Sequence, residues 1–302
     1  MIFFMQKAIS KYKYLYLLLL PLLVYYIVFC YVPMYGIILA FKTFDFSKGI
    51  WGSSWNNFQN FKNIFSNAGF IRAFRNTVLI SVGRLLIEFP IPILLSLLLN
   101  EITKNKVKKI YQTIFTFPHF LSWIILYGII VNLLSDQGVL NQILLFFNLK
   151  KNTILLDNTQ FVGFLFVTNI WKEAGWSSIL YLAAIAGINP ELYEAAKVDG
   201  ANRFQIIKAI TWPTLKATAL ILLILAVGNV MNGGFDQVFN LYNPAVLEYG
   251  DILDTFVYRS AFIDSTGFEF ATTVGFMKSI VNFALLFGAN SIVKAMSEEG
   301  GL

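Results

Sequence analysis

The segment Leu15–Phe29 reads LYLLLLPLLVYYIVF and contains no charged side chain. It belongs to a longer apolar stretch that continues through Ile37–Ala40, and no small-residue cleavage site of the signal-peptide kind follows it. A helix needs about 20 predominantly apolar residues to cross the hydrocarbon core of a bilayer. The stretch therefore predicts a membrane-spanning helix over about 14–40, and this prediction sets the fold class.

Five further stretches have the length and apolar character of bilayer-crossing helices. The six predicted spans cover about 14–40, 71–99, 110–134, 160–186, 214–235 and 271–293. The composition agrees, because 57% of the 302 residues are hydrophobic and 13% are charged. A soluble domain carries about a quarter charged residues. We therefore expect an all-α integral membrane protein with six transmembrane helices, in which residues 1–302 form a single transmembrane domain.

The distribution of lysine and arginine predicts the orientation of these spans. With the N-terminus in the cytoplasm, the inner segments hold 12 basic residues and the longer outer loops hold 6. Basic residues are enriched in cytoplasmic loops, so both termini are expected in the cytoplasm, as is the loop 187–213 between the fourth and fifth spans. The net charge of +6 arises from these short clusters beside apolar spans, which is not the pattern of a nucleic-acid-binding surface.

The loop 187–213 carries the signals of a rigid helical element. Asn189-Pro190-Glu191 supplies an N-cap side chain, a proline at the first helical position and an acid in the first turn. The residues up to Val198 can form two turns, and Gly200 suits a left-handed helix stop. The loop is therefore predicted to begin with a short, well-defined helix.

A second short helix is expected over 202–210, ending near Pro213, where the fifth span begins. The small side chains of Ala195 and Ala196 leave the first helix thin on one side. A thin, rigid helix is what a neighbouring protein needs in order to hold the loop in a cleft and transmit force.

The spacing of residues in this loop matches a known motif. Glu194-Ala195-Ala196, three residues, Gly200, nine residues, Ile210, one residue and Trp212-Pro213 resemble the EAA loop of bacterial ABC importer permeases. The family usually has leucine where Trp212 stands, a departure that affects packing rather than coupling. The resemblance implies that a separate ATPase grips this loop, through Glu194, Ala195, Ala196, Asp199 and Gly200.

Other stretches resemble the subgroup of these permeases that carries polysaccharides and complex oligosaccharides. They are Tyr31-Val32-Pro33-Met34-Tyr35-Gly36, Ala40-Phe41-Lys42, Gly49-Ile50-Trp51-Gly52-Ser53, Pro118-His119-Phe120-Leu121-Ser122-Trp123 and Asn240-Leu241-Tyr242-Asn243-Pro244. The resemblance covers nearly the whole chain and implies a type I importer in the bacterial cytoplasmic membrane. Such an importer has two homologous permeases, here expected as a heterodimer, two cytoplasmic ATPase subunits, an extracytoplasmic solute-binding protein and a carbohydrate substrate.

The chain itself is not expected to be an enzyme. It contains no G-x-x-x-x-G-K-[ST] phosphate loop, and Gly275-Phe276-Met277-Lys278-Ser279 lacks that spacing and context. No cofactor is therefore expected on this chain, and ATP and Mg2+ are expected on the partner ATPase subunits. Under this hypothesis, nucleotide closes the ATPase dimer, the docked loops move together and the spans switch from inward-facing to outward-facing.

Two charged residues in the second span are expected to pair. Arg84 and Glu88 lie four residues apart and can meet along one helical face. A charged side chain at the centre of a membrane helix costs about 2.5–3.5 kcal/mol on insertion scales, so such groups face protein or water. An internal pair that stabilises helix packing is the first interpretation, and a gate or substrate contact is the alternative.

Four residues of the later spans are candidates for a substrate path. Sugars are held by aromatic faces against their C–H surfaces and by amide or acid groups that meet their hydroxyls. Asn169 and Trp176 in the fourth span, and Asn229 and Asn232 in the fifth, lie in regions that resemble the sugar-contacting regions of disaccharide importers. Structural packing is the alternative role for each of them.

The last outer loop, about 236–270, is long and rich in acidic and aromatic residues. These features favour contact with a binding protein over a merely solvated acidic face. Asp251-x-x-Asp254 lacks further metal ligands in register, and the only histidine, His119, has no second imidazole or thiolate pair nearby. No metal site is expected, and a capping or packing role is preferred for His119.

Three other functions compete with this hypothesis. A permease of the same architecture for a smaller sugar, an amino acid or phosphate shares the fold but lacks the subgroup motifs. A membrane enzyme acting on lipid-linked sugars needs convergent acids or a metal, and the inner loops hold no acid-rich cluster beyond Glu191–Asp199. A secondary transporter needs an internal inverted repeat, and the six spans show no convincing one.

Overall fold

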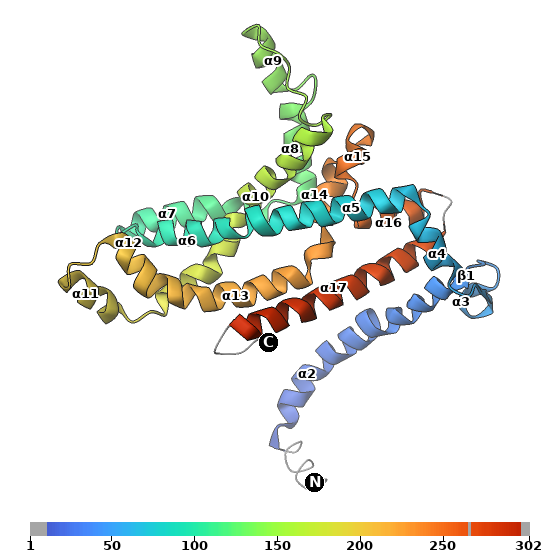
Figure 1. Cartoon of the computed structure of the whole chain (residues 1–302), viewed down its shortest axis with the longest axis horizontal. Coiled ribbons are helices and arrows are strands. Elements are labelled where there is room, and N and C mark those ends of the chain that lie inside the picture. The colour runs from blue at the N-terminus through green and yellow to red at the C-terminus, as the bar shows by residue number, and fades with distance from the viewer. Residues whose placement is uncertain (1–10, 265–266, 297–302) are drawn as a thin grey trace. The chain divides into compact units, whose positions relative to one another are not determined.

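The structure, a computed structural model, describes residues 11–264 and 267–296 and is almost wholly helical (Figure 1). The chain forms two compact units: Met1–Ser66 with Ser260–Phe276, and Asn67–Arg259 with Met277–Leu302. The termini expected in the cytoplasm, residues 1–10 and 297–302, lie outside the described residues. Within the described ranges, five helical stretches are long and apolar enough to cross a membrane: Lys13–Phe41, Ala68–Asn100, Trp123–Phe146, Arg203–Gly228 and Phe268–Ser291.

The first unit begins with a long helix that leads into a small hairpin. Its elements are α2 (Lys13–Tyr26), a π-helical turn (Ile27–Tyr31), a 3-10 helix (Val32–Phe41), β1 (Lys42–Thr43), α3 (Gly49–Gly52), β2 (Ser54–Trp55) and α4 (Gln59–Phe65). The two strands pair antiparallel with Lys42 opposite Trp55. Lys42 is buried, and its ammonium donates to the carbonyls of Ile50 and Trp51 at 2.8 and 3.1 Å. These bonds stabilise the buried charge and close the hairpin.

The second unit holds most of the helices. They are α5 (Ala68–Gly83), α6 (Pro90–Asn100), α7 (Asn105–Thr116), α8 (Trp123–Leu134), α9 (Val139–Phe146), α10 (Asn158–Ala186), α11 (Pro190–Val198), α12 (Arg203–Ile206), α13 (Trp212–Gly228), α14 (Phe235–Leu241), α15 (Leu247–Gly250) and α16 (Leu253–Phe262). Helix α16 belongs to the second unit up to Arg259 and to the first from Ser260. The last helix, α17 (Phe268–Met296), belongs to the first unit up to Phe276 and to the second from Met277.

Helix α10 is the central element of the second unit. It begins where the Asp157 side chain accepts the N–H groups of Thr159 and Gln160. One apolar core joins it to the α14–α16 region through Phe161, Leu165, Val238, Val246 and Ile252. A second core joins it to α6 and α13 through Ile93, Tyr181, Ile185, Leu215 and Ala219. The helix is 29 residues, or about 43 Å, long, which exceeds the thickness of a hydrocarbon core, although it is not one of the five candidate spans named above.

Three prolines inside long helical stretches each follow a π-helical turn. Ile27–Tyr31 precedes Pro33, Arg84–Glu88 precedes Pro90, and Ile207–Thr211 precedes Pro213. In each case the residue just before the proline donates its N–H to the carbonyl five residues back. The wider turn relieves the clash between the proline ring and the preceding turn, so each helix continues through its proline.

Two predicted spans differ from the observed helices. The range 110–134 is not one helix, because a 3-10 turn at Phe117–Phe120 and an extended residue, Leu121, separate α7 from α8. Pro118 lies in this turn, and the Ser122 side chain accepts the N–H of Ile125 to start a new helix. The range 214–235 also stops early, since α13 ends at Gly228 and the chain turns through Gly233 and Gly234.

A close approach between α7 and α10 depends on one glycine. A β-carbon added at Gly175 would lie 2.1 Å from the carbonyl oxygen of Phe115, so a side chain there forces the helices apart. We expect Gly175→Ala to destabilise the protein by about 1–3 kcal/mol, as overpacking does. Thermal unfolding in detergent, followed by tryptophan fluorescence, measures the effect.

Gly163 on the same helix is the matched control, because it is exposed and a β-carbon there meets nothing within 4 Å. Gly163→Ala should keep or slightly raise the midpoint of unfolding, since alanine favours helix. Equal midpoints for Gly175→Ala and Gly163→Ala would contradict the observed helix approach.

Candidate functional site

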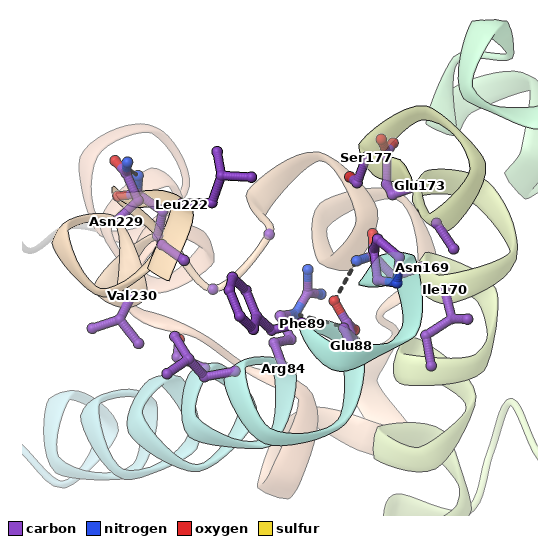
Figure 2. Close-up of a pocket in the computed structure, with 18 of the residues that line it drawn as sticks. Arg84, Glu88, Phe89, Asn169, Ile170, Glu173, Ser177, Leu222, Asn229 and Val230 are labelled. Atoms are coloured by element: carbon purple, nitrogen blue, oxygen red, sulfur yellow. Dashed lines mark hydrogen bonds and ion pairs between the residues drawn. The ribbon is translucent and has the colours of Figure 1, made fainter. Parts of the chain in front are cut away.

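A cavity of about 380 Å3 lies between the α5–α6 helix, α10 and the end of α13 (Figure 2). Its walls combine charged, amide and apolar groups. The lining residues include Ser81, Arg84, Glu88, Phe89 and Pro92 of the α5–α6 helix, Asn169, Ile170, Glu173, Ser177 and Tyr181 of α10, and Leu222, Asn229, Val230, Asn232, Gly233 and Gly234 at the end of α13. A hydroxyl-rich molecule finds both hydrogen-bond partners and apolar surface on such walls.

Arg84 and Glu88 lie on the π-helical turn and project into the space between α10 and the end of α13 (Figure 2). Arg84 Nε lies 4.0 Å from Glu88 Oε1, and both side chains are largely buried. The second carboxylate oxygen of Glu88 accepts a hydrogen bond from the Asn169 amide. The turn that accommodates Pro90 therefore also presents the charged pair to α10.

A third partner of the pair, Gln237, comes from α14. Its amide oxygen accepts a hydrogen bond from Arg84, and its amide nitrogen donates to the carbonyl of Leu165 at 2.7 Å and to the hydroxyl of Thr168 at 2.9 Å. Gln237 is fully buried. Gln237 is not among the residues predicted from sequence, because nothing in the sequence indicates that a glutamine beyond the predicted fifth span contacts the second span.

The glycine pair after α13 makes room for the guanidinium group. Gly233 and Gly234 have φ values of +54° and +80°. A β-carbon on Gly234 would lie 2.5 Å from Arg84 Nη1. Glycine is therefore required at Gly234 for its backbone conformation and for the close approach of Arg84.

A second charged cluster surrounds Glu173, one turn along α10. His119 Nδ1 lies 2.7 Å from Glu173 Oε2, and Lys172 Nζ lies 2.9 Å from Glu173 Oε1. Lys172 also donates to the backbone carbonyl of His119 at 2.7 Å. These contacts join the segment between α7 and α8 to α10. Each charged side chain of the cluster has a partner.

Of the four candidate path residues, the structure brings three to the same cavity. Asn169, Asn229 and Asn232 line it. Trp176 is not among the lining residues; its ring stacks on His119 with 4.4 Å between centroids and an angle of 4°. Because 45% of Trp176 is exposed, the stacked pair forms an accessible aromatic surface beside the Glu173 cluster.

Three acidic residues of the loop predicted to be the last outer one pair with basic side chains. Arg259 donates to both oxygens of the buried Asp251, at 2.6 and 3.2 Å, and Lys278 lies 2.6 Å from Asp254. The exposed Glu248 pairs with Arg75 at 3.2 Å. Within residues 11–264 and 267–296, no group of three or more His, Cys, Asp or Glu side chains is placed to hold a metal ion.

The loop between α10 and α13 forms the short helix α11, and Gly200 has a φ of +77°. Glu194, Ala195, Asp199 and Gly200 are exposed, and Ala196 is half-buried. The expected second helix differs from the structure: it starts at the Asn202–Gln205 capping box but does not end near Pro213. It runs through the π-helical turn into α13, because that turn tolerates the proline.

Comparison with known proteins gives the family. Residues 88–235 match the family described as binding-protein-dependent transport system inner membrane component. The protein LplB of Bacillus subtilis is 41% identical, over 98% of this chain and 93% of that one. The polygalacturonan/rhamnogalacturonan transport system permease protein YteP of the same organism is also 41% identical, over 95% and 90% of the two chains.

A solved structure has the same fold over its whole length. It is the crystal structure of a bacterial alginate ABC transporter in complex with an alginate pentasaccharide-bound periplasmic protein. The matched chain is 36% identical, covers 98% of this chain and 99% of its own length, and has a TM-score of 0.88. The chain therefore belongs to the binding-protein-dependent transport system inner membrane components, and it is a non-catalytic, membrane-embedded permease subunit of an ABC importer.

Proposed function

We propose that this permease forms one wall of a membrane path for an oligosaccharide or polysaccharide. The cavity between α5–α6, α10 and α13 carries the proposal, because its walls offer amides and hydroxyls next to apolar surface. Arg84 Nε and Glu88 Oε1, which lie 4.0 Å apart, have no hydrogen-bond partner among the described residues, so these atoms suit the hydroxyls of a sugar. The transport of polygalacturonan and rhamnogalacturonan by YteP, and of alginate by the matched transporter, supports this class of substrate.

The proposal includes partners on both sides of the membrane. A second, homologous permease supplies the opposite wall of the path, and an extracytoplasmic binding protein delivers the saccharide. Two ATPase subunits hold ATP and Mg2+ in the cytoplasm, on the side where both termini of this chain lie. The alginate transporter, which was crystallised with a saccharide-bound periplasmic protein, supports the binding-protein partner.

Within this assembly we assign α11 and Gly200 as the element that the ATPase grips. Four of the five residues assigned to it are exposed, so they are accessible to another subunit. Gly200 turns the chain back toward α12 in a left-handed conformation. A helix with a sharp turn at its end and no buried residue of its own is suited to seating in a groove of a partner.

The substrate class is tested with the cognate binding protein. Calorimetry against pectic oligosaccharides, neutral oligosaccharides, amino acids and phosphate should show saturable binding of a saccharide. The reconstituted complex should then hydrolyse ATP faster when that loaded binding protein is added. Binding of an amino acid or phosphate in place of a saccharide would refute the substrate assignment while leaving the family unchanged.

Gly200 provides a test of the docking element. A β-carbon there meets nothing within 4 Å, so Gly200→Val perturbs the loop through its backbone conformation alone. We expect Gly200→Val to lower binding-protein-stimulated ATP hydrolysis at least tenfold. Gly200→Asn should keep most of the stimulation, because asparagine tolerates the left-handed conformation. Normal stimulation in Gly200→Val would remove α11 from the coupling mechanism.

Asn229 provides a test of the path. Its amide donates to the carbonyl of Leu225, four residues back, and the residue lines the cavity. We expect Asn229→Ala to raise the concentration of loaded binding protein needed for half-maximal transport about threefold to tenfold, as the loss of one or two hydrogen bonds does.

Asn132→Ala is the matched control, since the exposed Asn132 makes the same bond to Gly128, four residues back, and does not line the cavity. It should leave transport unchanged. An equal effect of the two substitutions would assign Asn229 to helix stability.

A further inference from the structure

Helix α11 is only weakly packed against the rest of the permease. None of its residues is buried. It enters through Asn189 and leaves through the left-handed Gly200, so its two backbone connections are short loops. A force applied to α11 by a partner needs a firmer link to reach the membrane helices.

One side-chain hydrogen bond supplies a link. Tyr193 in α11 and Thr211 lie 18 residues apart, and their hydroxyl oxygens are 3.1 Å apart. Thr211 is fully buried, whereas Tyr193 is half-buried. Among the described residues, the other side-chain hydrogen bonds of α11 join Glu191 to Asn189 and stay within the helix start.

Thr211 sits where the following helix is most constrained. It ends the π-helical turn Ile207–Thr211, directly before Trp212-Pro213. One turn further along, Leu215 is buried against Tyr181 and Ile185 of α10. A displacement of Thr211 is therefore passed to a packed helix rather than absorbed by a loose one.

The same helix ends at the cavity. Helix α13 is 17 residues, or about 25 Å, long and is followed by Asn229 and Asn232, which line the cavity. Among the described residues, the other hydrogen bond or ion pair between a side chain of this loop and the second span is that of Arg203 with Glu101, which follows α6, at 3.6 Å. Arg203 is 79% exposed, and an exposed ion pair of this kind contributes little.

We propose that the Tyr193–Thr211 hydrogen bond is the joint through which α11 moves α13 and, with it, the cavity wall at Asn229. This inference rests on the proposed docking of α11 on the ATPase. Tyr193 is a positioning residue, because it acts on the path through Thr211. Removal of either hydroxyl allows α11 to move without α13. The change that nucleotide causes at the cavity is therefore expected to be threefold to tenfold smaller.

The test follows the cavity itself and needs no known substrate. In a Cys30→Ser background, Asn229→Cys introduces a reporter, and a maleimide labels it in the complete importer with and without ATP and vanadate. The ratio of the two labelling rates measures how far nucleotide changes the cavity. Tyr193→Phe and Thr211→Val should each reduce this ratio threefold to tenfold, and Thr211→Ser, which keeps the hydroxyl, should retain it.

A double variant, Tyr193→Phe with Thr211→Val, should reduce the ratio no further than either single change. The ATPase should still co-purify, because the five residues assigned to docking (Glu194, Ala195, Ala196, Asp199 and Gly200) are unchanged. An unchanged ratio in Tyr193→Phe, or independent effects that multiply in the double variant, would overturn the joint. If Thr211→Val fails to fold, the labelling ratios of Tyr193→Phe and Thr211→Ser are compared instead. A reduced ratio in Tyr193→Phe and a retained one in Thr211→Ser would support the joint, and equal ratios would overturn it.

Gly200→Val in the same assay separates the joint from the docking proposal. If Gly200→Val removes the nucleotide-dependent change and Tyr193→Phe does not, the joint is wrong and the docking stands. If Gly200→Val responds normally to nucleotide, the docking of α11 is wrong and the joint loses its basis.

Discussion

The ion pair of Arg84 and Glu88 is the constraint around which the second unit is arranged. A guanidinium group in a membrane helix needs a counter-charge and hydrogen-bond acceptors, because lipid supplies neither. Glu88 provides the charge, and Gln237 provides an acceptor from a helix more than 150 residues away in sequence. Gly234 leaves the space that the guanidinium occupies. One buried cation thereby joins the second span, α10 and the turn after α13 at the wall of one cavity.

The π-helical turns place functional groups as well as accommodating prolines. A π turn holds one extra residue, which rotates the rest of the helix by about 100° relative to an uninterrupted one. The turn at Arg84–Glu88 carries the buried ion pair, and the turn at Ile207–Thr211 carries the hydroxyl that meets Tyr193. In both cases a proline lies two residues after the π-helical turn. The widened turn that accommodates it also determines which side chains face the neighbouring helix.

The largest difference between sequence and structure lies at the predicted third span. Hydropathy runs without a clear break from about 110 to 134, but Pro118 and the Ser122 cap divide the segment into α7 and α8. The cluster of His119, Lys172 and Glu173 then ties that break to α10. His119 lies 54 residues before Glu173 in the sequence. Their contact joins two separate elements, and a periodicity within one segment carries no information about it.

The local and compositional features of the chain were readable without coordinates. Apolar runs determine the membrane class, capping residues and Gly200 determine α11, and the Glu194–Pro213 spacing identifies the permease family, because each depends on residues close in sequence. The tertiary structure decided the rest. It brought Gln237 to Arg84, left Trp176 on His119 outside the cavity lining, and linked Tyr193 to Thr211. Those contacts depend on how distant helices pack, and packing is a property of the whole chain.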